Sequence, residues 1–236
     1  MKISLIGRGR MAQAVERLAP EKGHRVVRLL GRRDNPPGRP FSGDWLEQSE
    51  VLVDFSLAEA VPGNIEKSLQ AGIPLVIGAT GWYDRLREME DKVEEAGGIV
   101  LYASNFSLGV QVLFSLTRRA ARLLSRFQEY DPFLWEAHHR HKLDAPSGTA
   151  LSLREIVEES YRRKLDVASL RAGSIPGTHV VGFDSPSDTL RLEHSARNRD
   201  GFALGSLLAA QWLRDQHKAG RKGLFTMQNV IEEQME

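Results

Sequence analysis

The stretch that decides the fold is residues 3–12, Ile3-Ser4-Leu5-Ile6-Gly7-Arg8-Gly9-Arg10-Met11-Ala12. Its first four residues predict a strand, and apolar residues at helical spacing over 11–18 predict a helix directly after the turn. Gly7 permits the tight turn, and Gly9 lets the backbone approach a phosphate. A dinucleotide pyrophosphate meets a helix at this point in α/β proteins, because free backbone N–H groups and the helix dipole attract anions. Ala12 replaces the third glycine of the usual pattern, so the turn by itself also fits an ordinary strand-to-helix connection.

Outward from this turn, short apolar runs alternate with helical patterns over the first hundred residues. The predicted strands cover residues 3–6, 25–30, 51–55, 75–79 and 99–103, with helices between them. This alternation predicts an α/β fold with a Rossmann-like, doubly wound parallel sheet, covered by helices and built with right-handed crossovers. The glycine turn therefore lies in the context that a dinucleotide-binding unit requires.

After residue 105 the pattern changes to long helices and strands of alternating polarity. Helices are predicted at 113–127, 149–163 and 205–214, and strands at 133–137, 180–183 and 190–194. This order predicts a smaller α+β domain. We therefore expect a dinucleotide-binding domain over 1–105 and a substrate-binding and oligomerisation domain over 106–214, with the tail of about 215–236 packing back on the first domain.

The composition excludes several classes of protein. The 236 residues include 32 basic and 31 acidic side chains, for a net charge of +1, and this balance argues against nucleic-acid binding as the main role. Because the chain has no cysteine, it has no disulfide scaffold, no thiol chemistry and no cysteine-based metal site. The uncharged segment 96–117 carries several polar residues, so we interpret it as a strand, a loop and a helix start. We expect a cytoplasmic protein without membrane contact.

The residues at the end of the second predicted strand are those expected to contact the ribose of the cofactor. It reads Gly31-Arg32-Arg33-Asp34. Guanidinium groups here hold a 2′-phosphate, whereas a carboxylate holds a ribose hydroxyl. Arg32 and Arg33 favour NADPH, whereas Asp34 is compatible with NADH. Alternatively, these residues form a solvated loop that does not bind the cofactor.

The most informative stretch is residues 136–149, Glu136-Ala137-His138-His139-Arg140-His141-Lys142-Leu143-Asp144-Ala145-Pro146-Ser147-Gly148-Thr149. Three histidines, an arginine and a lysine fall within five residues, directly after an apolar strand. Histidine is the natural proton donor near neutral pH, and a neighbouring lysine binds or protonates an anionic centre. The Pro-Ser-Gly-Thr sequence then opens a helix whose N–H groups and hydroxyls fit a carboxylate.

Two other interpretations of this stretch compete with a catalytic site. A histidine-rich tract can bind a metal, but no second group of ligands stands out and the neighbouring cations oppose it, so we expect no metal site. A solvated basic loop is the other alternative. The combination of proton-donating side chains with an anion-binding helix start favours catalysis over both.

With these motifs the chain resembles the dihydrodipicolinate reductases, also called 4-hydroxy-tetrahydrodipicolinate reductases, of bacterial lysine and diaminopimelate synthesis. The resemblance covers essentially the whole chain. Besides residues 136–149 it rests on Asp54-Phe55-Ser56, Gly78-Ala79-Thr80-Gly81, Ala103-Ser104-Asn105-Phe106-Ser107, Gly177-Thr178-His179, His194, Arg199, Phe202-Ala203 and Gly223-Leu224-Phe225. Ala79 stands where the family has threonine, and Ser104 where it has proline.

The resemblance implies that NADPH or NADH reduces a cyclic dicarboxylate, 4-hydroxy-tetrahydrodipicolinate, on a homotetramer. It implies His138 as the acid/base residue and Lys142 as a proton donor. The implied carboxylate-binding residues are His139, Lys142, Ser147, Gly148 and Thr149. The cofactor-binding candidates, from the residues and from the resemblance together, are Gly7, Arg8, Gly9, Arg10, Met11, Arg32, Arg33, Gly78, Ala79, Thr80, Gly81, Ala103, Ser104, Asn105 and Phe106.

Two other functions use part of the same features. A dinucleotide-binding regulator needs the glycine turn but has no use for His138, Lys142 and the helix start together. A dehydrogenase acting on an amino-acid semialdehyde through a thioester needs a cysteine, which is absent, and other such enzymes do not require the histidine-rich run. The sequence leaves open the cofactor preference, the assembly, the regulation, and whether the substrate is dehydrated before or on the enzyme.

Overall fold

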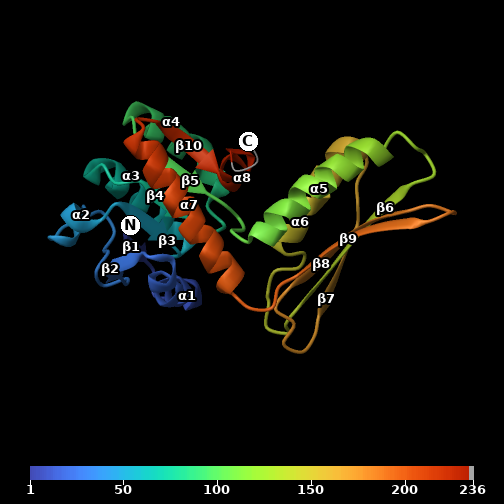
Figure 1. The fold of residues 1–236 in the computed structure, drawn as a ribbon, viewed down its shortest axis with the longest axis horizontal. Coiled ribbons are helices and arrows are strands. Elements are labelled where there is room, and N and C mark those ends of the chain that lie inside the picture. The colour runs from blue at the N-terminus through green and yellow to red at the C-terminus, as the bar shows by residue number, and fades with distance from the viewer. Residues whose placement is uncertain (234–236) are drawn as a thin grey trace. The chain divides into compact units, whose positions relative to one another are not determined.

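The computed structural model describes residues 1–233, which form two compact units. The first unit contains Met1–Ser107 and the segment from Arg199 onward, and the second contains Leu108–Asn198. Each unit has its own sheet (Figure 1).

The first unit is built on a parallel sheet of six strands in the order β10-β5-β4-β3-β1-β2. The strands are β1 (Lys2–Ile6), β2 (Arg25–Leu30), β3 (Val51–Asp54), β4 (Leu75–Ile77), β5 (Ile99–Tyr102) and β10 (Gly223–Thr226). β3 is buried along its whole length, which explains its apolar run Val51–Val53 before the buried Asp54. The predicted Rossmann-like sheet is confirmed, and β10, which the sequence pattern did not predict, adds a sixth strand.

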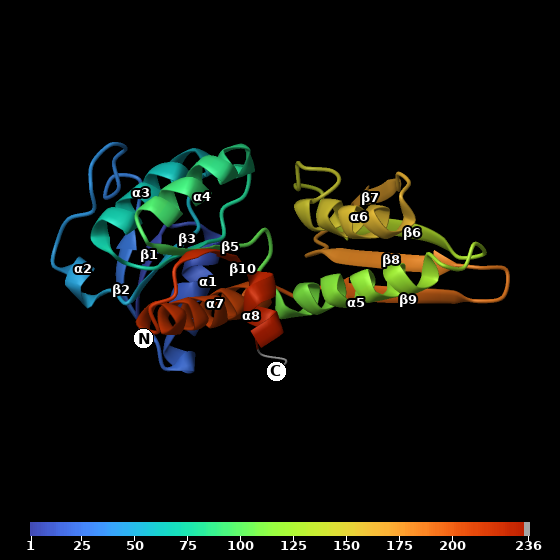
Figure 2. The same ribbon diagram turned by 90° about the horizontal axis from the view of Figure 1, so that it is seen from above.

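Helices cover both faces of this sheet, as Figure 2 shows. The helices are α1 (Arg10–Leu18), α2 (Trp45–Gln48), α3 (Val61–Ala71), α4 (Leu86–Glu95), α7 (Asp200–Lys218) and α8 (Met227–Glu233). α1 and α7 pack on the face that carries Val51 and Val53, whereas α3 and α4 pack on the face that carries Leu52. Successive residues of one strand point to opposite faces, so a single short strand supplies both cores.

The position of α7 corrects the predicted domain boundary. We expected 106–214 to form the second domain, but α7 belongs to the first unit, where it packs against α1 and the sheet. Gly205 of α7 lies so close to the chain at Phe106 that a Cβ on Gly205 would be 1.7 Å from the Phe106 carbonyl oxygen. Helical periodicity shows which face of α7 is apolar, but it does not show which sheet this face covers.

The second unit is a mixed sheet of four strands with two helices on one face. The strands are β6 (Asp131–His138), β7 (Val167–Arg171), β8 (Thr178–Asp184) and β9 (Thr189–Ser195), in the order β7-β6-β8-β9. β6 and β7 are parallel, and the other pairs are antiparallel. The helices α5 (Leu108–Leu124) and α6 (Gly148–Tyr161) share a core with Leu134, Val181 and Phe183 of the sheet. The smaller α+β unit is therefore confirmed, and β7 is a strand that the sequence pattern missed.

The uncharged segment 96–117 has the structure that its polar residues predict. It forms β5, a loop and the first turns of α5. Over residues 1–233, no helix combines the length and the apolar character needed to cross a bilayer.

Candidate active site

Three neighbouring strands of the second unit bring four polar side chains together. Glu136 and His138 lie two residues apart on β6, so both project from the same face of the sheet. Across the antiparallel pair, His179 of β8 stands opposite Glu136, and across the parallel pair, Arg171 of β7 stands opposite His138. Glu136 is fully buried and His138 is 8% exposed. The strand register therefore builds a buried polar cluster at the end of β6.

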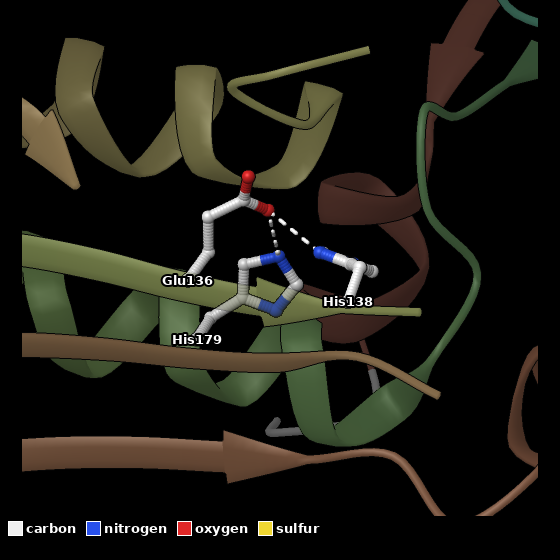
Figure 3. Close-up of side chains that lie close together, drawn as sticks. All are labelled: Glu136, His138 and His179. Carbon is white, nitrogen blue, oxygen red and sulfur yellow. Dashed lines mark ion pairs between the residues drawn. The ribbon is translucent and has the colours of Figure 1, made fainter. Parts of the chain in front are cut away.

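The Glu136 carboxylate is the centre of this cluster (Figure 3). Its Oε2 lies 2.8 Å from Nδ1 of His138 and 3.8 Å from Nε2 of His179. Its Oε1 accepts hydrogen bonds from Arg171 Nη2 at 2.6 Å and from the Ser147 backbone N–H at 3.2 Å. One carboxylate therefore contacts the predicted proton donor on one side and the predicted carboxylate-binding helix start on the other.

These contacts set the charge state of the cluster. Burial raises the pKa of Glu136, but hydrogen bonds from Ser147, Arg171 and Ser169, together with the charge of His138, outweigh burial and lower this pKa to about 2. Burial lowers the pKa of His179 to about 4. Burial also lowers the pKa of His138, against the opposing effect of the Glu136 charge. At neutral pH the cluster therefore holds an ionised Glu136 beside a neutral His179.

The N-terminus of α6 is the predicted anion-binding feature. Ser147 is the N-cap, and its Oγ accepts the Ala150 N–H at 3.3 Å and lies 3.1 Å from Nε2 of His179. No acidic residue lies in the first turn of this helix, and the carboxylate that contacts its start is that of Glu136, on the Ser147 N–H. A Cβ on Gly148 would meet no atom within 4 Å. The helix start is thus open to an anion.

The loop between β6 and α6 carries the remaining predicted residues. Lys142 Nζ lies 2.8 Å from Oδ1 of Asp144, and the Lys142 N–H donates to the His139 carbonyl at 3.1 Å. Arg171 Nη2 donates to the Asp144 carbonyl oxygen at 2.6 Å. Lys142 is therefore linked to the Glu136 cluster through Asp144 and Arg171, while the His139 ring lies next to that of His141, with ring centroids 6.4 Å apart.

From the sequence we predicted no role for three members of the cluster, Glu136, His179 and Arg171. Glu136 stands in the quoted stretch, and its spacing of two residues from His138 on a predicted strand was the available signal. His179 appeared only as a match to the family, and Arg171 did not appear at all. No local pattern reveals these two, because only the strand register brings them to Glu136.

Glu136, His138 and His179 are also close enough to chelate a cation, because their ligand atoms all lie within 4.8 Å of one another. However, the Arg171 guanidinium already binds the Glu136 carboxylate, and a metal would face this cation directly. We therefore do not assign a metal to this cluster.

In the first unit, the turn from β1 to α1 is shaped for a ligand. Gly7 has a φ of 102°, and a Cβ there would lie 2.5 Å from the Phe55 carbonyl oxygen, so only glycine fits. Gly9 is the N-cap of α1, has no side-chain cap, and has open space where a Cβ would be. α1, which begins with Arg10 and Met11, has no acidic residue in its first turn. These features fit a pyrophosphate group.

The other cofactor candidates follow the ends of β2, β4 and β5, which lie at the same edge of the sheet as this turn. Gly78–Gly81 follows β4, and a Cβ on Gly78 would lie 2.1 Å from the Phe55 ring. Ala103–Phe106 follows β5, and the Phe106 ring packs edge-on against Phe55, with ring centroids 6.2 Å apart. The turn after β1 and the segments after β4 and β5 therefore meet at Phe55.

In the turn after β2, the acidic residue is bound by neighbouring groups and the two arginines are exposed. Asp34 Oδ2 accepts the Gly31 N–H at 2.8 Å and Arg8 Nη2 at 3.1 Å, and its Oδ1 lies 3.6 Å from Arg28. These contacts, the Gly31 N–H foremost, lower the pKa of Asp34. Arg32 and Arg33 are exposed. The carboxylate is thus occupied by neighbours, while two guanidinium groups face solvent.

Comparison with known proteins places both units in one family. Residues 1–106 match the model for the N-terminus of dihydrodipicolinate reductase, and residues 109–231 match the model for its C-terminus. The 4-hydroxy-tetrahydrodipicolinate reductase of Christiangramia forsetii is 34% identical over 98% of this chain and 98% of its own length. The reductase of the same name from Zymomonas mobilis is 36% identical over 98% of this chain and 97% of its own.

A solved structure shares the fold. A dipicolinate-bound dihydrodipicolinate reductase from a Paenisporosarcina species aligns with a TM-score of 0.76, at 21% identity, over 98% of this chain and 99% of that chain.

Proposed function

The chain belongs to the dihydrodipicolinate reductase family, an NAD(P)H-dependent oxidoreductase family, and we propose that the site around His138 reduces 4-hydroxy-tetrahydrodipicolinate to tetrahydrodipicolinate. The observation that carries this proposal is the Glu136 carboxylate, which contacts both His138 and the Ser147 helix start. A proton donor and an anion-binding helix end therefore lie side by side, as protonation of a ring that carries carboxylates requires.

In this proposal the substrate's two carboxylates are held by the loop and the helix start. Lys142 supplies a positive charge, Gly148 and Thr149 supply backbone N–H groups at the N-terminus of α6, and Ser147 and Thr149 supply hydroxyls. His139 is the remaining carboxylate-binding residue. Because the dianion is fixed at several points, the ring has one orientation relative to the proton donor.

A pyridine nucleotide is the cofactor, and the first unit holds it. The Gly7–Met11 turn takes the pyrophosphate, and Gly78–Gly81 and Ala103–Phe106 line the nicotinamide half. When bound, the nucleotide supplies the hydride.

His138 and Lys142 provide the protons. The overall reaction consumes one hydride and one proton and releases the 4-hydroxyl group as water. Negative charge develops in the ring when the hydride adds, and an acid within reach neutralises this charge. Burial lowers the pKa of His138 in the free protein, whereas a bound dianion raises it by favouring the charged imidazolium. Substrate binding thus prepares His138 to donate a proton.

The test of this function is an optical assay of NADPH and NADH oxidation with freshly prepared 4-hydroxy-tetrahydrodipicolinate. Substrate-dependent oxidation of either nucleotide supports the proposal. Nucleotide binding without turnover supports the regulator instead, and oxidation that requires an amino-acid semialdehyde supports the alternative dehydrogenase.

We further propose that the cofactor is NADPH in preference to NADH, because Asp34 is occupied by Gly31, Arg8 and Arg28 while Arg32 and Arg33 are exposed. Replacing both exposed arginines by alanine is expected to raise the KM for NADPH by about 10-fold or more, the loss of one charge-assisted contact to a 2′-phosphate. The KM for NADH is expected to change by less than about twofold. In the control Arg39→Ala, the KM values for NADPH and for NADH are both expected to change by less than about twofold. Equal increases for both nucleotides would contradict this assignment.

We propose that the protein is a homotetramer assembled through the second unit's sheet. The face away from α5 and α6 exposes 37% of Trp135 and 53% of Leu170. Light scattering is expected to give about four times the 26.4 kDa mass of the chain, and Leu170→Glu is expected to lower that mass because it buries a charge in the interface. Leu57→Glu, at another exposed leucine of the first unit, is the control. An unchanged mass for Leu170→Glu would exclude this face.

A further inference from the structure

Glu136 has no role in the reaction described above, although it is the residue that the site is built around. It is the one fully buried carboxylate of the cluster, and buried charges are costly unless several partners hold them. Here Arg171 and the Ser147 N–H hold one oxygen, Oε1. The other oxygen, Oε2, is left to face His138 at 2.8 Å. Arg171 and Ser147 thus form a clamp that holds one oxygen of the carboxylate in place, and the other oxygen contacts the His138 imidazole.

We propose that Glu136, clamped by Arg171, is a positioning residue that holds His138 by its Nδ1, so that Nε2 is the nitrogen that exchanges protons with the substrate. This inference rests on the proposed function, because it takes His138 as the proton donor. Glu136 itself touches neither substrate nor cofactor in this scheme and acts only through His138.

The surroundings of Nε2 support this assignment. Gly177 lies on that side, where a Cβ would be 3.0 Å from Nε2 and 3.2 Å from Cδ2 of His138. Gly177 has a φ of 151° and carries no side chain to cover the ring. One nitrogen of His138 therefore faces a carboxylate oxygen, and the other faces a glycine, which places no side chain against it. An imidazole with this arrangement has one defined tautomer when neutral.

Arg171 makes the clamp rigid. The same Nη2 donates to Glu136 Oε1 and to the Asp144 carbonyl oxygen, both at 2.6 Å, so the guanidinium ties β7 to β6 and to the loop that carries Lys142. The Ser147 N–H and the Arg171 guanidinium stabilise the ionised form of Glu136 and so help to lower its pKa to about 2. An ionised carboxylate can accept a hydrogen bond from an Nδ1–H but cannot donate one, and this fixes the direction of the contact.

The charged groups around His138 determine how its titration responds to a change at position 136. Glu136 faces it from β6, Lys142 and Asp144 from the following loop, Arg171 from β7, and His179 from β8, with His194 of β9 opposite His179. Burial lowers the pKa of His138, Lys142 and Arg171 lower it further, and Glu136 and Asp144 raise it. Removing the Glu136 charge therefore lowers this pKa. Because the proposed donor is protonated His138, the alkaline limb of the kcat profile moves to lower pH.

The experiment compares Glu136→Gln with wild type. We expect kcat at neutral pH to fall by about 10- to 100-fold, a part of the roughly 100- to 10,000-fold that a well-placed acid contributes. The alkaline limb of the kcat profile is expected to shift to lower pH, while the KM for the nucleotide stays unchanged. Glu136→Asp retains the charge but shortens the reach to Nδ1, so it is expected to keep the limb near its wild-type position and to recover only part of kcat. Glu159→Gln, an exposed glutamate on α6, is the matched control.

A double-mutant cycle separates positioning from a general structural role. If Glu136 acts through His138, adding Glu136→Gln to His138→Gln is expected to lower kcat by less than about threefold, because the contact is already lost. If Glu136→Gln lowers kcat as much in the His138→Gln background as it does in the wild type, the proposal is overturned. A Glu136→Gln variant with the wild-type kcat and an unshifted alkaline limb would also overturn it. Thermal unfolding midpoints are measured for each variant. If Glu136→Gln does not fold, Glu136→Asp decides, since wild-type kcat in that variant contradicts a distance-dependent contact.

A second readout does not depend on the reaction. In ¹⁵N NMR spectra, the imidazole of His138, assigned by its absence in His138→Gln, is expected to carry its proton on Nδ1 in the neutral form. A neutral form protonated on Nε2 would overturn the inference even in an active enzyme. If the wild-type protein does not oxidise either nucleotide with the substrate, the proposed function fails, and the spectrum still decides whether Glu136 sets the tautomer.

Discussion

Replacing His138 by glutamine is expected to lower kcat by about 100- to 10,000-fold, the usual contribution of a placed acid. Glutamine has a similar length and can still contact Glu136, but it cannot transfer a proton at neutral pH. His138 is 8% exposed at the end of β6 and lies within the second unit, whereas the residues proposed for the nucleotide belong to the first. We therefore expect the affinity for NADPH, measured by fluorescence titration, to remain that of the wild type.

The control for this substitution is His217→Gln, at an exposed position on α7. It makes the same chemical change on the other unit and is expected to leave kcat unchanged. A His138→Gln variant that turns over at the wild-type rate would remove His138 from the mechanism. A variant that loses nucleotide binding as well would mean that the substitution disturbs the fold, which its thermal unfolding midpoint would show.

Replacing Lys142 by alanine is expected to lower both turnover and substrate affinity. Lys142 now pairs with Asp144 at 2.8 Å and is partly exposed, so its ammonium group is available for a substrate carboxylate. The loss of a charge-assisted hydrogen bond corresponds to about 10- to 100-fold in affinity. The loss of a proton donor adds a decrease in kcat of about 100-fold or more.

Two measurements separate the two roles of Lys142. Calorimetric titration with dipicolinate reports the loss of carboxylate binding without turnover, and saturating substrate reports the loss in kcat. Lys164→Ala, at an exposed position outside the site, is expected to change neither. If Lys142→Ala lowers affinity but leaves kcat intact, Lys142 binds the substrate and His138 alone supplies the proton.

The sequence predicted the elements whose pattern is local. The apolar run of β3 and the glycine turn before α1 are recognisable because burial on both faces and a tight turn each demand particular residue types. The same holds for residues 136–149, where the proton donors and the helix cap are neighbours in the chain. Glu136 and His138 share a face because they alternate on one strand.

The features that the sequence did not predict depend on contacts between distant segments. Arg171 and His179 reach Glu136 only through the register of β7 and β8, which no local pattern encodes. β7 itself is mostly exposed, so it has little apolar alternation to recognise. α7 was assigned to the wrong unit because its apolar face fits any sheet. The cofactor preference depends on which charges near Asp34 neutralise one another, and this appears only when Arg8 and Arg28 are placed beside it.

The return of the chain to the first unit at Arg199 has a consequence for synthesis on the ribosome. The second unit is one uninterrupted segment, Leu108–Asn198, whereas the first is completed only when α7 and β10 have been made. Until then one face of the sheet, with Leu5 and Val53, is covered by α1 but lacks α7, and β5 lacks its outer partner. The inserted unit can therefore finish folding first, and the half-built sheet that precedes it is the part of the nascent chain that most needs protection from aggregation.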